Sequence, residues 1–256
     1  IRSGAFPVQM PLPFIVGLLP MTVAGDAGFN MPPPGGAAPL EPKHIMALLN
    51  FAAILMGTTL TVRDLIGERA VYRREQAVGL SASAYLLAKI AVFGAVAVAQ
   101  SAVLVAVVTA PGIGKPPPAR AVALGSPMLE LFIAVAATSV VAVMLGLLAS
   151  SLARTSDQVI IALAAVLTAQ LVLAGGFIPV TGRPLLDALS WLTPSRWGLA
   201  ATASTSDLTS LVLGIAPDAH WRHTPSTWFF DVAVLGVLAI LYTGITRWAL
   251  RRRSGR

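Results

Sequence analysis

Residues 61–89 hold a dense set of side chains that could bind a partner or carry out chemistry. They read TVRDLIGERAVYRREQAVGLSASAYLLAK and interleave basic with acidic residues. Glu68 precedes Arg69 and Arg73 at spacings that can place opposite charges on one face of a helix. The segment 63–83 contains no proline, so it predicts one or two short amphipathic helices. Such helices could dock a soluble partner or serve only as a solvated anchor, and the charge pattern leaves both open.

Hydrolytic chemistry needs a nucleophile beside a base, and the chain offers only one weak arrangement of that kind. Ser81 lies in a Gly-Leu-Ser-Ala sequence similar to the serine motif of six-span intramembrane proteases. The predicted spans place His44, His220 and His223 across the membrane from Ser81. A nucleophile and a base on opposite faces cannot share a proton. An intramembrane serine protease is therefore the weakest alternative, and no catalytic residue is assigned.

Metal and nucleotide chemistry also lack their usual residues. The chain has no cysteine. His220 and His223, two imidazoles close in sequence, fit surface residues better than a metal site, so no metal site is predicted. Residues 112–115 read Gly-Ile-Gly-Lys but lack the GxxxxGK[ST] spacing of a phosphate-binding loop. We therefore expect no cofactor in this chain and no ATP hydrolysis by it.

The composition favours lipid rather than water as the surrounding solvent. Hydrophobic residues make up 56% and charged residues 11%, with a mean hydropathy of +0.78, whereas soluble domains carry about 25% charged residues. The net charge is +7. Much of the basic charge flanks apolar runs, at 63–89 and 247–256, a pattern typical of membrane topology rather than nucleic-acid binding. A span needs about 20 apolar residues. Six are predicted, at about 6–24, 44–62, 84–110, 127–152, 158–177 and 227–250.

The connecting segments predict how the chain is oriented. Segment 178–226 contains semi-apolar stretches too short to span, so we expect a re-entrant or interfacial segment there. With six spans, both termini lie on one side, which carries 12 of the 18 Lys and Arg residues. The positive-inside rule makes that side cytoplasmic. Arg251–Arg253 fits an anchor at the anionic inner leaflet. Because the chain starts at Ile1 and is apolar almost at once, we expect it to begin inside a longer polypeptide.

The middles of the predicted spans carry no charged residue. Ion-coupled carriers usually keep an ionisable group at that depth, so another energy source is expected. Neutral polar residues do occur there, including Asn50 and Gln170. Each could form hydrogen bonds between helices or face a substrate path. A channel or a structural membrane subunit remains an alternative, although the spans show little polar pore lining.

Two motifs match a known pattern. Glu68-Arg69, Tyr72 and Glu75 fit ER-x-x-(Y/F)-x-x-E, and residues 175–178 read Gly-Gly-Phe-Ile. An external motif follows, matching at Trp191, Thr193, Pro194, Arg196, Trp197 and Ala200. The sequence resembles ABC-2 type permeases of the ABCG-like (white/breast-cancer-resistance) class over essentially its whole length. The loop is similar to bacterial exporters that fuse forkhead-associated domains, an ATPase and this permease.

The resemblance implies particular roles for matching residues. A coupling helix over 66–76 would rest on an ATPase domain, with Ile66, Glu68, Arg69, Tyr72, Arg73 and Glu75 as its coupling residues. Phe177 and Ile178 would form an outer gate. Met56 lies where some members place an aromatic clamp for flat substrates. Because methionine is flexible, it suits a long lipid chain better than a stacked ring. Asn50, Met56 and Gln170 make up the predicted substrate path.

The resemblance further implies an all-α membrane-spanning half of an ATP-driven exporter. The expected substrate is lipid-like or amphipathic, with a glycolipid as one candidate. ATP and magnesium would bind a nucleotide-binding domain, expected upstream in the same polypeptide. A second copy would complete a homodimer in membrane lipid, and no nucleic-acid partner is expected. The implied location is the plasma (inner) membrane of a bacterium.

Overall fold

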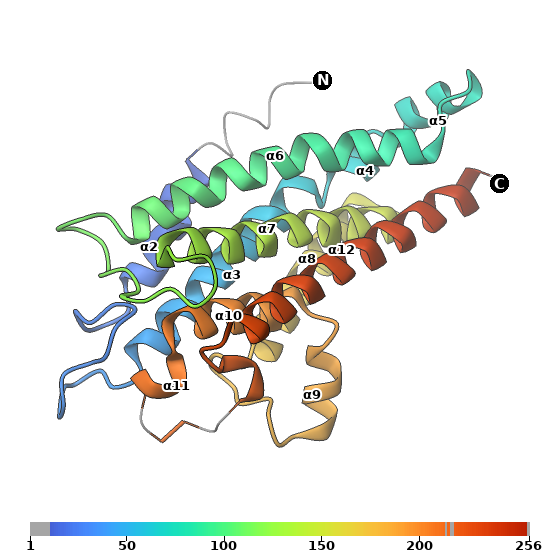
Figure 1. Cartoon of the computed structure of the whole chain (residues 1–256). Helices are drawn as coiled ribbons and strands as arrows, with labels where there is room; N and C mark the ends of the chain where they lie inside the picture. The colour runs from blue at the N-terminus through green and yellow to red at the C-terminus, as the bar shows by residue number, and fades with distance from the viewer. Residues whose placement is uncertain (1–10, 213, 216–217, 255–256) are drawn as a thin grey trace.

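The computed structural model describes residues 11–212, 214–215 and 218–254 (Figure 1). All regular structure in these residues is helical. Four helices are long and apolar enough to cross a membrane. They are α3 (Glu41–Thr61), α6 (Ala82–Val108), α7 (Pro127–Leu152) and α12 (Pro225–Ser254). The predicted all-α membrane fold is therefore confirmed, and these helices match the second, third, fourth and sixth predicted spans to within a few residues.

The other two predicted spans are shorter helices than the sequence suggested. α2 (Leu12–Met21) covers part of the predicted span 6–24, whose first residues lie outside the described part of the chain. Ten helical residues rise only about 15 Å, half of a bilayer core. α8 (Ser156–Leu173) stops before the predicted end at 177. Gly175, just after the helix, has a positive φ of 84°. The crossing of the membrane by α2 and α8 stays a prediction.

Hydroxyl side chains and prolines set where the long helices begin. Ser81, Ser126 and Thr155 precede α6, α7 and α8, and each side chain accepts a hydrogen bond from a backbone N–H of the first turn. Such N-caps satisfy donors that a helix start leaves unpaired. Proline follows the cap at α7 and also opens α12, where its missing N–H costs nothing.

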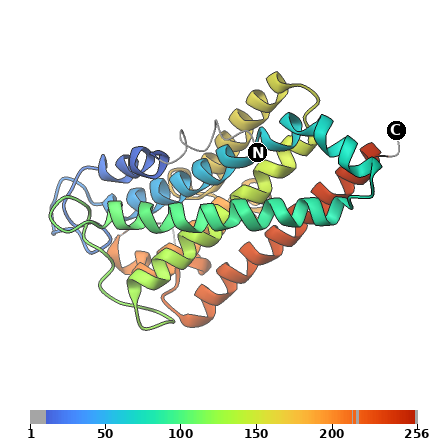
Figure 2. The ribbon, with the colours of Figure 1, turned by 90° about the horizontal axis from the view of Figure 1, so that it is seen from above.

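α7 lies at the centre of the bundle, against α3, α6, α12 and α10 (Pro194–Ser206) (Figures 1 and 2). The contact between α3 and α7 is close because both helices carry glycine there. A Cβ on Gly57 would collide with the Ser139 carbonyl oxygen, and one on Gly146 would collide with Thr61 Oγ1. Small residues that bring helix backbones together are typical of membrane packing.

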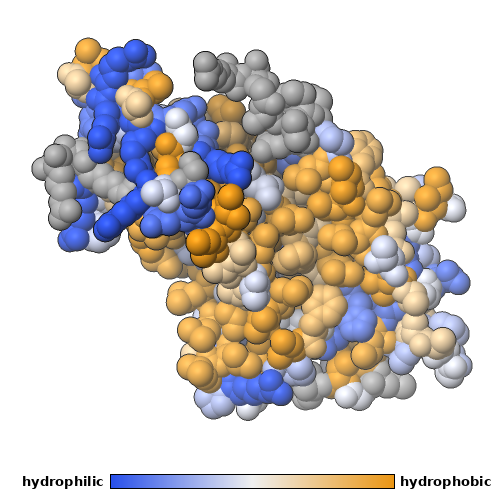
Figure 3. Space-filling model, turned by 180° about the vertical axis from the view of Figure 1, so that it is seen from behind, coloured by the Kyte–Doolittle hydropathy of each residue, from blue (hydrophilic) through white to orange (hydrophobic). Residues whose placement is uncertain are grey.

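The two ends of the bundle differ in structure and in polarity. At one end lie α4 (Asp64–Gly67), α5 (Arg69–Ala77) and the end of α12. The other end carries α9 (Pro184–Ser190), α11 (Leu208–Leu211) and the short η1 (Ala219–Trp221). Seen from behind, a broad hydrophobic surface covers the long helices and a hydrophilic cluster marks the α5 end (Figure 3). A lipid-facing belt with one strongly polar end fits a membrane protein.

Candidate functional site

The predicted coupling segment folds as two short helices rather than one. α4 ends at Gly67, α5 begins at Arg69, and Glu68 lies between them. Tyr72 is buried, and its ring packs against that of Tyr85 with centroids 4.6 Å apart. It belongs to an apolar cluster that also contains Leu86 of α6, so the α4–α5 hairpin is packed onto the bundle rather than free in solvent.

Glu68 does not use the pairing that its sequence spacing suggested. Within the described residues its ion pair is with Lys89 of α6, at 2.7 Å, and its carboxylate also accepts a hydrogen bond from the Tyr85 hydroxyl at 3.1 Å. Asp64 pairs with the same lysine at 2.8 Å. The predicted pairing with Arg69 and Arg73 is wrong, because these residues lie one and five positions after Glu68 and neither spacing is the three or four residues that make neighbours on a helix. Lys89 instead fastens the hairpin to α6.

A second set of bonds joins the hairpin to the turn between α7 and α8. The Arg69 guanidinium donates to the carbonyl oxygens of Ala153, at 2.7 Å, and Arg154, at 3.3 Å. The backbone N–H of Ile66 donates to the Ser150 hydroxyl at 3.2 Å. Carbonyls at the end of a helix lack internal partners, so α7 offers a natural acceptor for a guanidinium. The hairpin is therefore bonded to α6, to the end of α7 and to the turn that leads into α8.

The opposite face of α5 points into solvent. Arg74 and Glu75 are exposed, and none of the ion pairs formed among described residues includes them. Val78, at the tip of the hairpin, has a side chain that is 86% exposed. The hairpin thus has one face bonded to the membrane helices and one charged face open to a partner.

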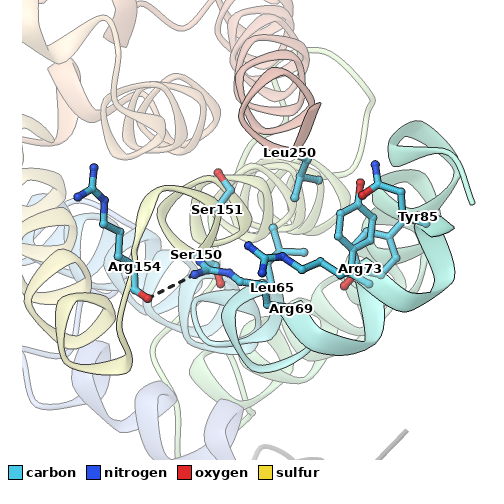
Figure 4. Close-up of a pocket in the computed structure, with 10 residues that line it drawn as sticks. Leu65, Arg69, Arg73, Tyr85, Ser150, Ser151, Arg154 and Leu250 are labelled. Atoms are coloured by element: carbon cyan, nitrogen blue, oxygen red, sulfur yellow. Dashed lines mark hydrogen bonds between the residues drawn. The ribbon is translucent and has the colours of Figure 1, made fainter. Parts of the chain in front are cut away.

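A pocket of about 410 Å³ lies behind the hairpin (Figure 4). It is bounded by α5, the start of α6, the end of α7 and the end of α12. Basic and hydroxyl side chains line much of it, namely Arg69, Tyr72, Arg73, Ser150, Ser151 and Arg154. The sequence motifs gave no sign of this pocket, because its lining comes from four separate segments.

The predicted substrate-path residues lie inside the bundle. Asn50 is 1% exposed, and its amide nitrogen donates to the Met46 carbonyl and the Thr202 hydroxyl, each at 2.9 Å. Gln170 is 3% exposed and accepts a hydrogen bond from the Ser195 N–H at 3.0 Å. Met56 is fully buried. Both amide side chains therefore form hydrogen bonds between helices in this structure. Either could contact a substrate only if the helices separated.

These hydrogen bonds hold α10 within the bundle. Every residue of α10 is buried, and the helix contacts α3, α7, α8 and α12. Gly198 makes the approach possible, because a Cβ there would collide with Thr138 and come within 2.5 Å of Asn50 Oδ1. Asp207 then ends the helix in the left-handed conformation, with φ of 55°, and α11 follows directly. The short helix α10 thus enters between the long helices without crossing the bundle.

The predicted outer-gate residues follow α8 at the end away from α5. Phe177 and Ile178 are 40% and 36% exposed. The Phe177 ring stacks on His44 at the start of α3, with centroids 5.5 Å apart. Gly176 lets this segment approach α3, since a Cβ there would collide with Ala47. The two residues are therefore held at the rim of the bundle.

The end of the bundle away from α5 also contains a buried ionic cluster that sequence reasoning missed. Arg196 of α10 pairs with Asp218, which also accepts hydrogen bonds from the Thr181 hydroxyl and the His220 N–H. Burial alone would raise the pKa of Asp218, but Arg196 and these donors outweigh it and hold the pKa below its usual value. His220 Nδ1 lies 3.4 Å from an Asp231 oxygen. Arg196 was recognisable as a motif position, but nothing in the spacing indicated its partner.

The structure gives no support to the serine-protease alternative or to a metal site among the described residues. Ser81 caps α6 beside α5, whereas His220 belongs to η1 at the opposite end (Figure 1). Among the described residues no group of three or more His, Cys, Asp or Glu side chains is placed to hold a metal ion.

Long apolar helices, an inserted short helix and a charged hairpin at one end define a polytopic helical membrane protein. The chain belongs to the ABC-2 type transporter family, whose family model matches residues 6–205. It is 52% identical over 254 residues to the ABC transporter ATP-binding/permease protein Rv1747 of Mycobacterium tuberculosis. That alignment covers 98% of this chain and 29% of the relative, so the chain spans less than a third of the relative's length.

Proposed function

We propose that this chain is the membrane-spanning half of an ATP-driven exporter and that the α4–α5 hairpin receives the ATPase domain. The observation that carries this proposal is the two-sided character of the hairpin. Arg74 and Glu75 are exposed on one side, while Glu68 and Arg69 are bonded to the membrane helices on the other. A segment that only anchors topology needs charge but no such bonds to several helices.

The bonds define a route by which movement of α5 would reach the membrane helices. Lys89 carries it to α6, the bond of Ile66 carries it to Ser150 of α7, and the bonds of Arg69 carry it to the turn that precedes α8. Tyr72 packs between these two attachments and keeps α5 from sliding over the bundle. ATP-driven closure of the ATPase domains would then push the hairpin, tilt α6 and α8 and open the outer end past Phe177 and Ile178.

The energy source would be ATP and magnesium bound to a nucleotide-binding domain outside this chain. The sequence contains no phosphate-binding loop of its own. The relative is a protein whose name joins ATP-binding and permease functions, and this chain matches less than a third of it. Both points support an ATPase domain upstream in the same polypeptide.

A homodimer is proposed because α8 leaves an apolar face uncovered. Ile160 and Ile161 are 51% and 70% exposed, and Leu171 is 36% exposed. α8 lies at the edge of the bundle, while most of α3 beside it is buried. A second copy facing α8 would cover this surface and enclose a central cavity between the two chains.

The proposed substrate is lipid-like or amphipathic, and a glycolipid is one candidate. The long helices carry few polar side chains, and Asn50 and Gln170 are already bonded within the chain. A cavity that opens by separating α3, α8 and α10 would expose these two amides and Met56 among apolar side chains. Such a lining binds a hydrocarbon chain with a small number of polar contacts.

The proposed location is the plasma (inner) membrane, with both termini on the cytoplasmic side. The α5 end and the end of α12 lie together, and both are rich in arginine. The positive-inside rule assigns such an end to the cytoplasm. An ATPase domain at α5 would then have access to cytoplasmic ATP.

The test is the ATPase activity and transport of the complete polypeptide in lipid, with Glu75→Gln and Glu68→Ala variants. Glu75 is exposed and unpaired within the described residues, so its loss should uncouple hydrolysis from transport without unfolding the protein. Asp26→Asn is the matched control, since Asp26 is exposed in the loop before α3 at the opposite end. If both hairpin variants hydrolyse ATP and transport at the rates of the unmodified protein, the hairpin is only an anchor and the exporter proposal fails.

A further inference from the structure

The pocket behind the α4–α5 hairpin has the charge of an anion site. The Arg73 side chain reaches into it from α5, whereas Arg154 borders it at the α7–α8 turn with a guanidinium that points away from the other lining residues (Figure 4). Among the described residues the Arg73 guanidinium has no acidic partner. The nearby carboxylates Asp64 and Glu68 do not line the pocket and are both paired with Lys89. The positive charge of Arg73 therefore faces a space whose lining contains no carboxylate.

Hydroxyl groups add donors to the same space. The Tyr72 side chain lines the pocket, and the residue is 7% exposed. Its hydroxyl has no hydrogen-bond partner among the described residues. A buried hydroxyl without a partner is uncommon in folded proteins and calls for an explanation. Ser150 and Ser151 also line the pocket, and the Ser151 hydroxyl already donates to the Leu148 carbonyl. The Tyr72 hydroxyl is thus the clearest donor waiting for an acceptor.

The position of the pocket points to the membrane surface as the source of that acceptor. Leu250, near the end of α12, forms one wall. Trp248 and Arg252 flank Leu250 in the sequence, and the Arg252 guanidinium carbon lies 3.8 Å from the centroid of the Trp248 ring. Trp248 is 51% exposed. Exposed tryptophan beside arginine at a helix end is typical of the level of lipid headgroups. The volume of about 410 Å³ lies at the low end of the range for small-molecule sites.

We propose that this pocket binds the phosphate group of an anionic phospholipid from the leaflet that surrounds the α5 end. The phosphate oxygens would accept hydrogen bonds from Arg73 and the Tyr72 hydroxyl, which are donors of the kind that phosphate prefers. The glycerol and upper chain would lie along Leu250 toward the bilayer. The bound lipid would bridge α5, the end of α7 and the end of α12, which all border the pocket.

The experiment measures lipid retention by the complete polypeptide in the absence of ATP, so its result is separate from that of the coupling proposal. Delipidated protein is reconstituted into nanodiscs of phosphatidylcholine with or without phosphatidylglycerol, and bound lipid is counted by native mass spectrometry. Arg73→Gln and Tyr72→Phe should each weaken phosphatidylglycerol binding about three- to tenfold. The loss for phosphatidylcholine should be smaller, because its choline cation offsets the phosphate charge that Arg73 attracts. Tyr72→Phe keeps the ring that packs on Tyr85, so it removes only the hydroxyl.

Arg74→Gln is the matched control, because Arg74 is exposed on the same helix and does not line the pocket. The proposal is overturned if Arg74→Gln weakens phosphatidylglycerol binding as much as Arg73→Gln does. Equal binding of inorganic phosphate would make the pocket a soluble-anion site and overturn the lipid assignment. Unchanged lipid binding with a loosened ATPase domain in Arg73→Gln would show that an acidic side chain of that domain fills the pocket instead.

Discussion

The Arg69 side chain and the Ala153 carbonyl oxygen, 84 residues apart in sequence, are joined by a hydrogen bond of 2.7 Å. This bond links the amphipathic hairpin directly to the turn that begins α8. α8 exposes much of one face and lies at the edge of the bundle (Figure 2). Arg69 therefore connects the segment proposed to receive force with the turn that leads into a membrane helix at the edge of the bundle.

Replacing Arg69 should weaken this connection without unfolding the protein. Arg69→Ala should lower the free energy of unfolding by about 1 kcal/mol, since a partly exposed charged hydrogen bond is lost. Transport should fall more than ATP hydrolysis. Both are measured on the complete polypeptide in lipid, with Arg74→Ala as control. Equal losses in the two variants would mean that the bond transmits nothing.

Lys89 forms ion pairs with two carboxylates, so replacing it alone should destabilise the protein. The Asp64 and Lys89 side chains are only 13% and 16% exposed, so Lys89→Met should leave Asp64 partly buried without its cation. We expect a loss of about 2 kcal/mol in unfolding free energy, below the cost for a fully buried pair because some water reaches the site. Adding Asp64→Asn should restore part of that loss in thermal unfolding measured in detergent. A double variant no more stable than the single one would contradict the pairing.

The entry of α10 into the bundle depends on the absence of a side chain at Gly198. Gly198→Val should force Thr138 and Asn50 apart and destabilise the protein by about 1–3 kcal/mol. Gly236 in α12 has no atom near its added Cβ, so Gly236→Ala should be neutral or slightly stabilising. Thermal unfolding of the two variants makes the comparison. A tolerated Gly198→Val would mean that α10 is not tightly inserted.

The Arg196–Asp218 pair should make the outer end sensitive to acid. The pKa of Asp218 is lower in the folded state than in the unfolded chain, where it is about 3.9. Its stabilising effect is thus fully present above that value and is lost as the pH falls through the lower folded pKa. Asp218→Asn should cost about 3 kcal/mol at pH 7 by leaving the buried Arg196 unpaired. Unfolding temperatures between pH 7 and pH 3 test this, and exposed Asp26→Asn should match the unmodified protein.

The chain contains no cysteine, which makes a direct test of the homodimer possible. Ile161→Cys on α8 should form a disulfide between two copies in a cysteine-free background of the complete polypeptide. Val237→Cys on α12 is the control, because Val237 is 62% exposed, similar to Ile161 at 70%. Gel electrophoresis without reducing agent separates the two outcomes. Cross-linking only through Val237 would place the second copy against α12 instead.

The sequence predicted the four long helices well because each begins at a proline or a hydroxyl side chain, which are local signals of a helix start. Ser126-Pro127 starts α7 as expected. The partners of charged residues were not predictable in the same way. Glu68 and Lys89 are separated by a chain reversal at Gly79, whose φ is 103°, so no helical spacing relates them. A partial signal existed, since Tyr85 and Lys89 are four residues apart on one face of α6 and both bind Glu68.

The amide side chains show a different limit of sequence reasoning. Asn50 could be assigned a depth from its place in an apolar run, but not a direction around the helix. α10 comes 144 residues after Asn50 and supplies its partner Thr202. The external motif at 191–200 indicated that this segment matters, yet it did not indicate that the helix turns inward.

The complete burial of α10 has a consequence for how the protein is assembled. Its sequence, PSRWGLAATASTS, carries an arginine and several hydroxyl groups, so it would not enter lipid by itself. Its surroundings include α12, which is synthesised later. The packing around α10 can therefore be completed only after α12 has been synthesised. Protease accessibility of residues 194–206 would accordingly report whether a newly made chain has matured.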